Sequence, residues 1–188
     1  MMCKLIVFNN LSVDGRFVDR NGSMSWAKNS NDEEFDAFAS DNARGGGTLL
    51  FGRVTYELMA GFWPTRQAID SLPIVAERMN KGPKIVFSRT LEKASWNNTR
   101  LVTGDLVAEI RKLKKEPGDG MVILGSGSLV SQLAREGLID EFQIVLIPAA
   151  LGAGRTMFDG LKERLSLKLT RSRVFRNGNV FLCYETGA

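Results

Sequence analysis

Three segments of this sequence place arginine, hydroxyl side chains or glycine directly after a short apolar run. They cover residues 52–55, 88–90 and 125–128, and the runs before them are typical of buried strands. The forked donors of arginine suit phosphate, and glycine lets a ligand approach the backbone closely. If the runs form neighbouring parallel strands, the segments meet at one edge of the sheet, where open α/β sheets bind ligands. The pattern predicts a site for a nucleotide or another phosphorylated ligand.

The last of these segments carries the strongest signal. An apolar run over residues 121–124 leads into Gly125-Ser126-Gly127-Ser128, and a helical pattern follows. Free N–H groups at the start of such a helix favour a phosphate. Val130 stands where a dinucleotide fingerprint has its third glycine, and no Gly-Lys-Ser/Thr follows, so neither a Rossmann motif nor a P-loop fits. The alternative interpretation is a tight strand-to-helix turn without a ligand.

Two residue counts restrict the available chemistry. The 188 residues include no histidine, which excludes triads, metal sites and acid–base steps that need imidazole. Cys3 and Cys183 are the only cysteines, too few for a zinc or iron–sulfur site, so we expect no bound metal. Both cysteines lie in strand-like sequence, and we expect them to be buried thiols in a reducing cytoplasm.

Charge and hydropathy indicate a small-molecule partner. The formal net charge of +4 suits an anionic small molecule and does not require nucleic acid. The basic run at residues 111–115 ends a helical pattern, where cations complement the helix dipole, so we interpret it as a solvated helix end. No apolar run approaches the roughly 18 residues of a membrane span. No signal peptide precedes the first strand-like residues, and we expect a cytoplasmic location.

Apolar periodicity and turn residues predict a single α/β domain over residues 1–188. Strands are expected over residues 3–9, 48–51, 84–87, 101–102, 121–124, 141–147, 165–175 and 180–185. Helices are expected from near Asn31, after a capping-box spacing at Ser30 and Glu33, to Arg44, and over residues 52–59, 73–82, 105–115 and 127–137. We also expect a bend over residues 10–15 and a hairpin turn over 176–179. These elements predict three layers around a mixed, mostly parallel sheet with a C-terminal antiparallel hairpin.

Six motifs occur in order along nearly the whole chain. They are Ser-Val-Asp-Gly at 12–15, Met-Ser-Trp at 24–26, Phe-Gly-Arg-Val-Thr-Tyr-Glu at 51–57, Phe-Ser-Arg-Thr at 87–90, Ile-Leu-Gly-Ser-Gly-Ser-Leu at 123–129 and Gly-Arg-Thr-Met-Phe at 154–158. Their order and spacing resemble the dihydrofolate reductase superfamily. The similarity is greatest to the branch that contains the reductase domain of riboflavin biosynthesis and its small stand-alone relatives.

The resemblance implies an NADPH site across the three strand-end segments. Gly52, Arg53 and Thr55 stand where the family holds the phosphates and adenosine of the cofactor. Ser88, Arg89 and Thr90 stand where it recognises the 2′-phosphate. The pyrophosphate turn corresponds to Gly125, Ser126, Gly127, Ser128 and Leu129. Many dihydrofolate reductases carry another arginine at the position of Ser128, so here the preference for NADPH over NADH depends on Arg53 and Arg89.

The resemblance also implies a substrate pocket beside the nicotinamide. Its residues are expected to be Asn9, Asn10, Asp14, Trp26, Phe35 and Phe38. The family places one carboxylate on the first helix to promote protonation, and Asp32, Glu34 and Asp36 all stay open for that role. The alternative is that these acids simply complement the start of a helix, and that Trp26 belongs to the core.

The resemblance implies a reductase that transfers a hydride to a pyrimidine- or pterin-like heterocycle. The expected type is 5-amino-6-(5-phosphoribosylamino)uracil reductase, with a dihydrofolate or pteridine reductase as the alternative. A non-catalytic nucleotide-binding protein is the alternative of another class. A homodimer is expected as well, because the apolar stretch 144–151 is longer than one half-buried strand needs; a fully buried central strand explains it equally well.

Overall fold

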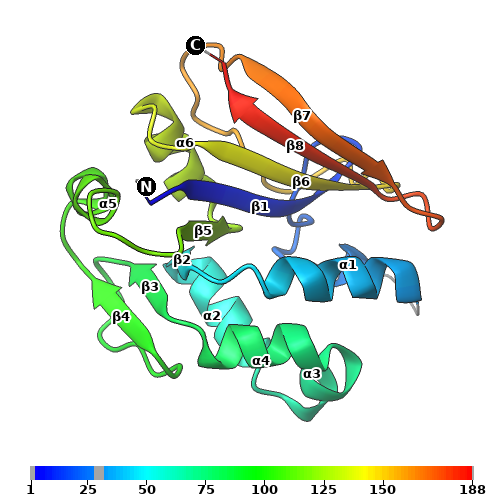
Figure 1. Cartoon of the computed structure of the whole chain (residues 1–188), viewed down its shortest axis with the longest axis horizontal. Coiled ribbons are helices and arrows are strands. Elements are labelled where there is room, and N and C mark those ends of the chain that lie inside the picture. The colour runs from blue at the N-terminus through cyan, green and yellow to red at the C-terminus, as the bar shows by residue number, and fades with distance from the viewer. Residues whose placement is uncertain (1–2, 28–31, 188) are drawn as a thin grey trace.

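Short apolar runs form the strands of one mixed sheet in the computed structural model, which describes residues 3–27 and 32–187 (Figure 1). The strands are β1 (Leu5–Ser12), β2 (Thr48–Gly52), β3 (Lys84–Phe87), β4 (Thr99–Val102), β5 (Met121–Leu124), β6 (Glu141–Ile147), β7 (Leu167–Val174) and β8 (Val180–Thr186). Their order in the sheet is β4-β3-β2-β5-β1-β6-β8-β7. Neighbours from β4 to β6 are parallel, and β8 is antiparallel to β6 and β7. The predicted fold class is confirmed.

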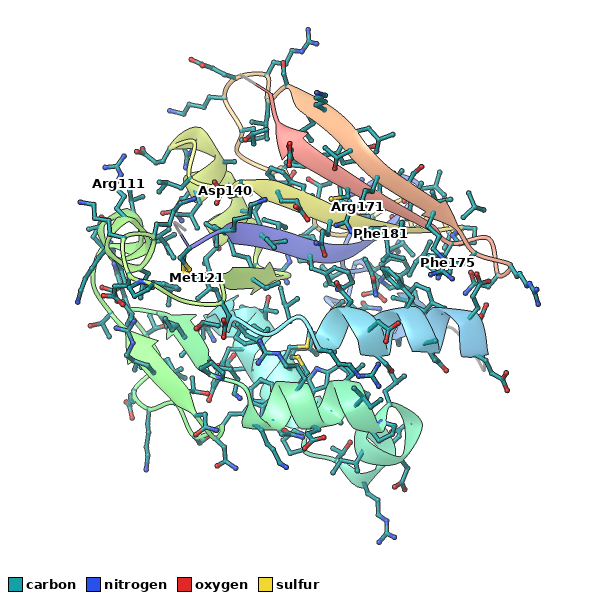
Figure 2. The ribbon with its side chains drawn as sticks, viewed as in Figure 1. Arg111, Met121, Asp140, Arg171, Phe175 and Phe181 are labelled. Carbon is teal, nitrogen blue, oxygen red and sulfur yellow. The ribbon has the colours of Figure 1, made fainter. Side chains whose placement is uncertain are left out.

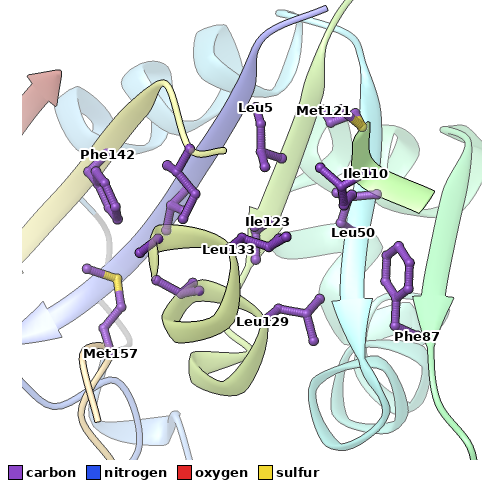
Figure 3. Packing of buried hydrophobic residues seen from close by; sticks show 14 of the residues in the cluster. Leu5, Leu50, Phe87, Ile110, Met121, Ile123, Leu129, Leu133, Phe142 and Met157 are labelled. Atoms are coloured by element: carbon purple, nitrogen blue, oxygen red, sulfur yellow. The ribbon is translucent and has the colours of Figure 1, made fainter. Parts of the chain in front are cut away.

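Helices cover both faces of this sheet. They are α1 (Glu33–Ala43), α2 (Arg53–Phe62), α3 (Arg66–Ser71), α4 (Pro73–Lys81), α5 (Leu106–Leu113) and α6 (Gly127–Arg135), with a 3₁₀ turn η1 (Ser25–Ala27). Successive strand residues point to opposite faces. Leu50 therefore packs in a cluster with α5 and α6, whereas Phe51 packs in another with α2 and α4 (Figure 3 shows the first cluster). A third cluster joins α1 to the hairpin of β7 and β8.

Strand β1 runs further than the sequence predicts. Asn10 and Ser12 belong to the strand, not to the expected bend, because they continue the parallel ladder with β6 from Val145 to Ile147. Helix α1 begins at Glu33, and Asp32 is its N-cap, accepting the N–H of Phe35 at 3.0 Å. Ser30 and Asn31, the expected helix start, lie outside the described residues.

One helix and one strand boundary differ from the prediction. Helix α3 was not predicted, because only Ala68 of its six residues is buried and six residues give little periodicity. Strand β4 begins at Thr99, two residues early. The hairpin turn lies where it was predicted, with Phe175 N–H donating to the carbonyl of Asn179 at 2.9 Å. Both cysteines are buried, as expected.

Strand β6 accounts for the first half of the apolar stretch 144–151, because the strand ends at Ile147. It lies between β1 and β8, and its residues Ile144 and Val145 pack into different clusters on opposite faces of the sheet. A strand covered on both faces is apolar along its whole length. None of the helices in residues 3–27 and 32–187 has the length and apolar character that crossing a membrane requires.

Candidate active site

An open cleft of about 410 Å³ lies at the C-terminal ends of β2 and β5. It is lined by Phe17, Gly52, Arg53, Val54, Thr55, Ser126, Gly127, Ser128, Ser131, Arg155, Thr156 and Asp159. Seven of these residues come from the two predicted cofactor segments at 52–55 and 125–128. Residues that are more than seventy positions apart in the sequence therefore form one wall.

Two helices of this cleft begin without a side-chain cap. The N-caps of α2 and α6 are Gly52 and Ser126. Gly52 has no side chain, and the side chain of Ser126 accepts no hydrogen bond from its own helix. The N–H groups of the first helical turn have no partner inside a helix, and the helix dipole adds positive potential there. Two such ends facing one cleft suit a ligand with two adjacent negative groups.

The turn between β5 and α6 is built from two left-handed residues. Gly125 has φ +59° and Ser126 has φ +51°. A Cβ at Gly125 would lie 2.8 Å from Cγ2 of Thr55, so the position has room for glycine alone. Two hydrogen bonds of Ser126 offset its unfavourable backbone conformation. Its Oγ accepts the N–H of Gly52 at 2.7 Å, and its backbone N–H donates to Oγ1 of Thr55 at 3.1 Å.

The opposite wall of the cleft comes from the segment after β6, which sequence reasoning left without a role. Arg155 lines the cleft beside the ring of Phe17, 5.5 Å from its centroid. Thr156 donates its hydroxyl to Asp159 at 2.5 Å, and this hydrogen bond is the main reason why the pKa of Asp159 lies below its ordinary value. The signal for this wall was the Gly-Arg-Thr-Met-Phe motif at 154–158.

The 88–90 segment lies at the same sheet edge but outside the lining of the cleft. Gly52 pairs with Phe87 across β2 and β3, so Ser88 follows beside the start of α2. The hydroxyl of Ser88 accepts the N–H of Thr90 at 3.1 Å, and Arg89 is exposed. The side chain of Leu129, the last residue predicted for the third segment, is buried in the core beneath Gly52.

Asp14, predicted for the substrate pocket, connects two loops through hydrogen bonds. It accepts the hydroxyl of Ser12 at 2.6 Å and the N–H groups of Leu151 and Gly152 at 3.0 and 2.9 Å, and it pairs with Arg16. These hydrogen bonds, that of Ser12 first, hold the pKa of Asp14 far below its ordinary value. The carboxylate therefore stays ionised and fixes the loop after β1.

The side chain of Asn9, predicted for the substrate pocket, is 3 % exposed and is engaged by Gly125 and Met157. Asn10 is half-buried and points to the other face of β1, the face that α1 covers. Of the two asparagines, only Asn10 lies on the side expected for the substrate.

The predicted aromatic residues do come together, but in a packed cluster. Phe35 meets the ring of Phe175 edge-on at 5.2 Å, and Phe38 lies 4.9 Å from Phe181. Trp26 packs against the same cluster from η1, and its buried Nε1 has no hydrogen-bond partner among the described residues. These side chains join α1 to the hairpin as well as bordering the expected pocket.

The three candidate acids occupy different environments. Asp32 caps α1. The carboxylate of Glu34 accepts a hydrogen bond from the guanidinium of Arg173 at 2.9 Å and one from the backbone N–H of Arg176 at 3.2 Å. Both lower the pKa of Glu34, and the bond from Arg173 has the larger effect. Asp36 has a raised pKa, because burial disfavours its charge and Asp32 is a nearby negative group. Between Glu34 and Asp36, the raised pKa of Asp36 is the shift in the direction that a proton donor needs.

The basic run at the end of α5 is engaged by carboxylates. Arg111 pairs with Glu136 at 2.7 Å, and Lys114 contacts Asp140 (Figure 2). Within the part of the chain that the structure describes, no three acidic or cysteine side chains gather closely enough to hold a metal ion.

Comparisons with known proteins agree with this fold. A sequence profile described as the RibD C-terminal domain matches residues 3–181. The uncharacterized protein YyaP of Bacillus subtilis (strain 168) is 29% identical over 182 residues, which are 97% of this chain and 94% of YyaP. The crystal structure of a Shewanella sp. PV-4 protein named for riboflavin biosynthesis has a TM-score of 0.74 at 25% identity and covers 100% of both chains.

A bifunctional enzyme of Thermotoga maritima shares the fold at lower identity. It is named a diaminohydroxyphosphoribosylaminopyrimidine deaminase/5-amino-6-(5-phosphoribosylamino)uracil reductase. The TM-score is 0.66 at 15% identity, and the match covers 99% of this chain and 57% of the bifunctional chain.

Proposed function

Because the chain belongs to the RibD C-terminal domain family, we propose that it is an NADPH-dependent reductase acting on a pyrimidine- or pterin-like heterocycle. The observation that carries this proposal is the cleft between α2 and α6. Two uncapped helix ends face it, and Arg53 and Arg155 add two guanidinium groups. This donor set fits the pyrophosphate of a dinucleotide.

The remaining residues fit the other parts of the cofactor. Arg89, exposed beyond β3, is free to approach the 2′-phosphate that distinguishes NADPH. Bound NADPH supplies the hydride. The chain's own contribution to the reaction is to hold the cofactor at the strand ends, and to offer a proton from Asp36 at the sheet face that α1 covers.

The proposed substrate is the type that the family suggests. A riboflavin-pathway pyrimidine comes first, and dihydrofolate or another pteridine is the alternative within the same reaction class. The packed aromatic cluster around Phe35 and Phe38 favours a second candidate function, nucleotide binding without turnover, because these rings, expected to border a substrate, pack against each other and against the hairpin.

A single assay separates these candidates. NADPH oxidation is followed at 340 nm with a panel of ribosylaminopyrimidines, pterins and flavins. Turnover of one pyrimidine supports the leading assignment, and turnover of a pterin alone supports the alternative. NADPH binding without oxidation of any member of the panel supports the non-catalytic candidate.

We expect NADPH to bind about tenfold or more tightly than NADH, since about 1.4 kcal/mol corresponds to tenfold and a charged contact to phosphate contributes about 1.5–3 kcal/mol. Arg89→Ala should remove most of that preference and leave NADH affinity unchanged. Calorimetry with both nucleotides measures it. Arg66→Ala is the matched control, because Arg66 is exposed on α3 and pairs only weakly with Asp70 at 3.7 Å. Equal affinities of the unmodified protein for both nucleotides would contradict the prediction.

We expect a homodimer as well, although β6 no longer supports it. The outer strand β7 offers a free edge, and its residues Leu169 and Val174 are 50% and 71% exposed. Light scattering at micromolar concentration should give twice the 20.8 kDa chain mass, and Val174→Lys should shift the mass toward the monomer. Ile69→Lys, at an exposed apolar residue on α3, is the control. A monomer in the unmodified protein would refute the expectation.

A further inference from the structure

Asn9 is a buried amide in an otherwise apolar row. Leu5, Val7, Asn9 and Leu11 point to the same face of β1, and the three leucine and valine side chains belong to the core. Burying an amide costs free energy unless hydrogen bonds compensate it. The hydrogen-bond partners of the Asn9 amide therefore show why a polar side chain stands at this position.

The amide of Asn9 replaces the β1–β5 ladder at the point where that ladder ends. The parallel pairing stops at Phe8 and Leu124. In the next position the Oδ1 of Asn9 accepts the N–H of Gly125 at 2.7 Å, and its Nδ2 faces the carbonyl of Gly125 at 3.4 Å. The orientation of the amide is fixed, because a backbone N–H can only donate. The N–H and the carbonyl of Gly125 thus keep hydrogen-bond partners although the chain leaves the sheet after Leu124.

The same amide reaches the opposite wall of the cleft. Its Nδ2 lies 3.2 Å from the Sδ of Met157, a fully buried residue directly after the cleft residues Arg155 and Thr156. On the other side, Gly125 leads into Ser126, whose N–H and Oγ bond Thr55 and Gly52. One side chain beneath the floor of the cleft is therefore linked to both of its walls.

We propose that Asn9 is a positioning residue for the dinucleotide, which it orients through Gly125 and Met157 without touching it; this inference rests on the proposed binding of NADPH. The Gly125–Ser126 turn sets where the free N–H groups of α6 stand relative to those of α2. Fixed donors bind a pyrophosphate more tightly than donors that must first be ordered. The hydrogen bonds of Asn9 to Gly125 fix these donors from the core side of the turn.

The test compares NADPH affinity with stability in three variants. In Asn9→Ala both backbone groups of Gly125 lose their partner, and we expect NADPH to bind about tenfold more weakly by calorimetry, the factor that corresponds to about 1.4 kcal/mol. Ile110→Val, in the same cluster on α5 but outside the cleft, is the matched core control. Urea unfolding is measured for both variants, and the control should keep its NADPH affinity whatever stability it loses.

Asn9→Asp adds a readout that a purely structural role would not produce. The introduced carboxylate keeps the acceptor for Gly125 N–H but repels the carbonyl of Gly125, whereas the protonated carboxyl can donate to it as the amide does. NADPH affinity relative to the unmodified protein should therefore recover as pH falls. If Asn9→Ala does not fold, this variant carries the test by itself.

The outcomes separate the two proposals. Unchanged NADPH affinity in Asn9→Ala, or a ratio for Asn9→Asp that does not vary with pH, overturns the role of Asn9 and leaves the proposed reductase intact. An unmodified protein that does not bind NADPH overturns the proposed function, and the inference about Asn9 with it.

Discussion

Replacing Asp36 with asparagine should lower turnover about 10²–10⁴-fold on a confirmed substrate, the usual contribution of a positioned general acid. Reduction of a C=N or C=O group needs one proton for each hydride, and the chain has no histidine to provide it. Asparagine has nearly the shape of aspartic acid but cannot give up a proton. NADPH affinity should stay the same, because Asp36 lies on α1 and does not line the cleft.

Two neighbours on α1 are matched controls for this variant. Asp32→Asn should keep turnover at a pH low enough to leave Asp36 protonated in both proteins, because asparagine is an equally good N-cap. Glu34→Gln should also keep it, since Glu34 is turned toward the hairpin by Arg173 and its lowered pKa leaves it ionised at neutral pH. Full activity in Asp36→Asn, or an equal loss in all three variants, would contradict the assignment to Asp36.

The pH dependence gives an independent check of the same acid. Burial, and secondly the charge of Asp32, raise the pKa of Asp36 above its ordinary value. Only the protonated carboxyl donates, so kcat should fall as pH rises through that raised pKa. Removing the charge of Asp32 in Asp32→Asn should move the midpoint to lower pH, which a proton supplied directly by water would not explain.

Local sequence signals predicted the elements that depend on local chemistry. The hairpin turn at 176–179 and the strand before Gly125 follow from turn residues and apolar runs, which act over a few positions. The strand-end pattern also predicted that the 52–55 and 125–128 segments would meet. That prediction needed only the rule that parallel strands end at one edge.

Features that depend on distant partners could not be predicted in this way. The end of β1 looked like a bend because its ladder partner, Val145–Ile147, lies more than 130 positions away. Glu34 and Asp36 are equivalent in sequence, and only the contact of Glu34 with Arg173 separates them. Asn9 was placed in the substrate pocket because no local pattern shows that its amide turns inward to Gly125.

Lys84→Met should lower the free energy of unfolding by about 1–3 kcal/mol, the cost of leaving buried hydrogen-bonding groups without their partner. Lys84 is 2% exposed at the start of β3. Its Nζ donates to the carbonyls of Met79, Asn80 and Gly82 at 2.8, 3.2 and 2.7 Å, and lies 4.6 Å from the centroid of the Trp96 ring. These carbonyls end α4 and have no partner inside the helix. Methionine keeps the apolar stem but offers no donor.

The pH dependence of this loss shows how burial affects the charge of Lys84. Burial, and secondly the charge of Arg78, lower the pKa of Lys84 to about 8, against 10.5 in the unfolded chain. Between these values the unfolded chain binds the extra proton, so unfolding becomes less favourable as pH rises. The stability difference between the unmodified protein and Lys84→Met should therefore be constant below pH 8 and grow above it. Lys81→Met is the control in urea unfolding, because Lys81 is exposed, its pair with Glu77 raises its pKa, and its contribution should not grow over this range. A difference for Lys84→Met that stays flat to pH 10 would show that burial does not lower the pKa of Lys84.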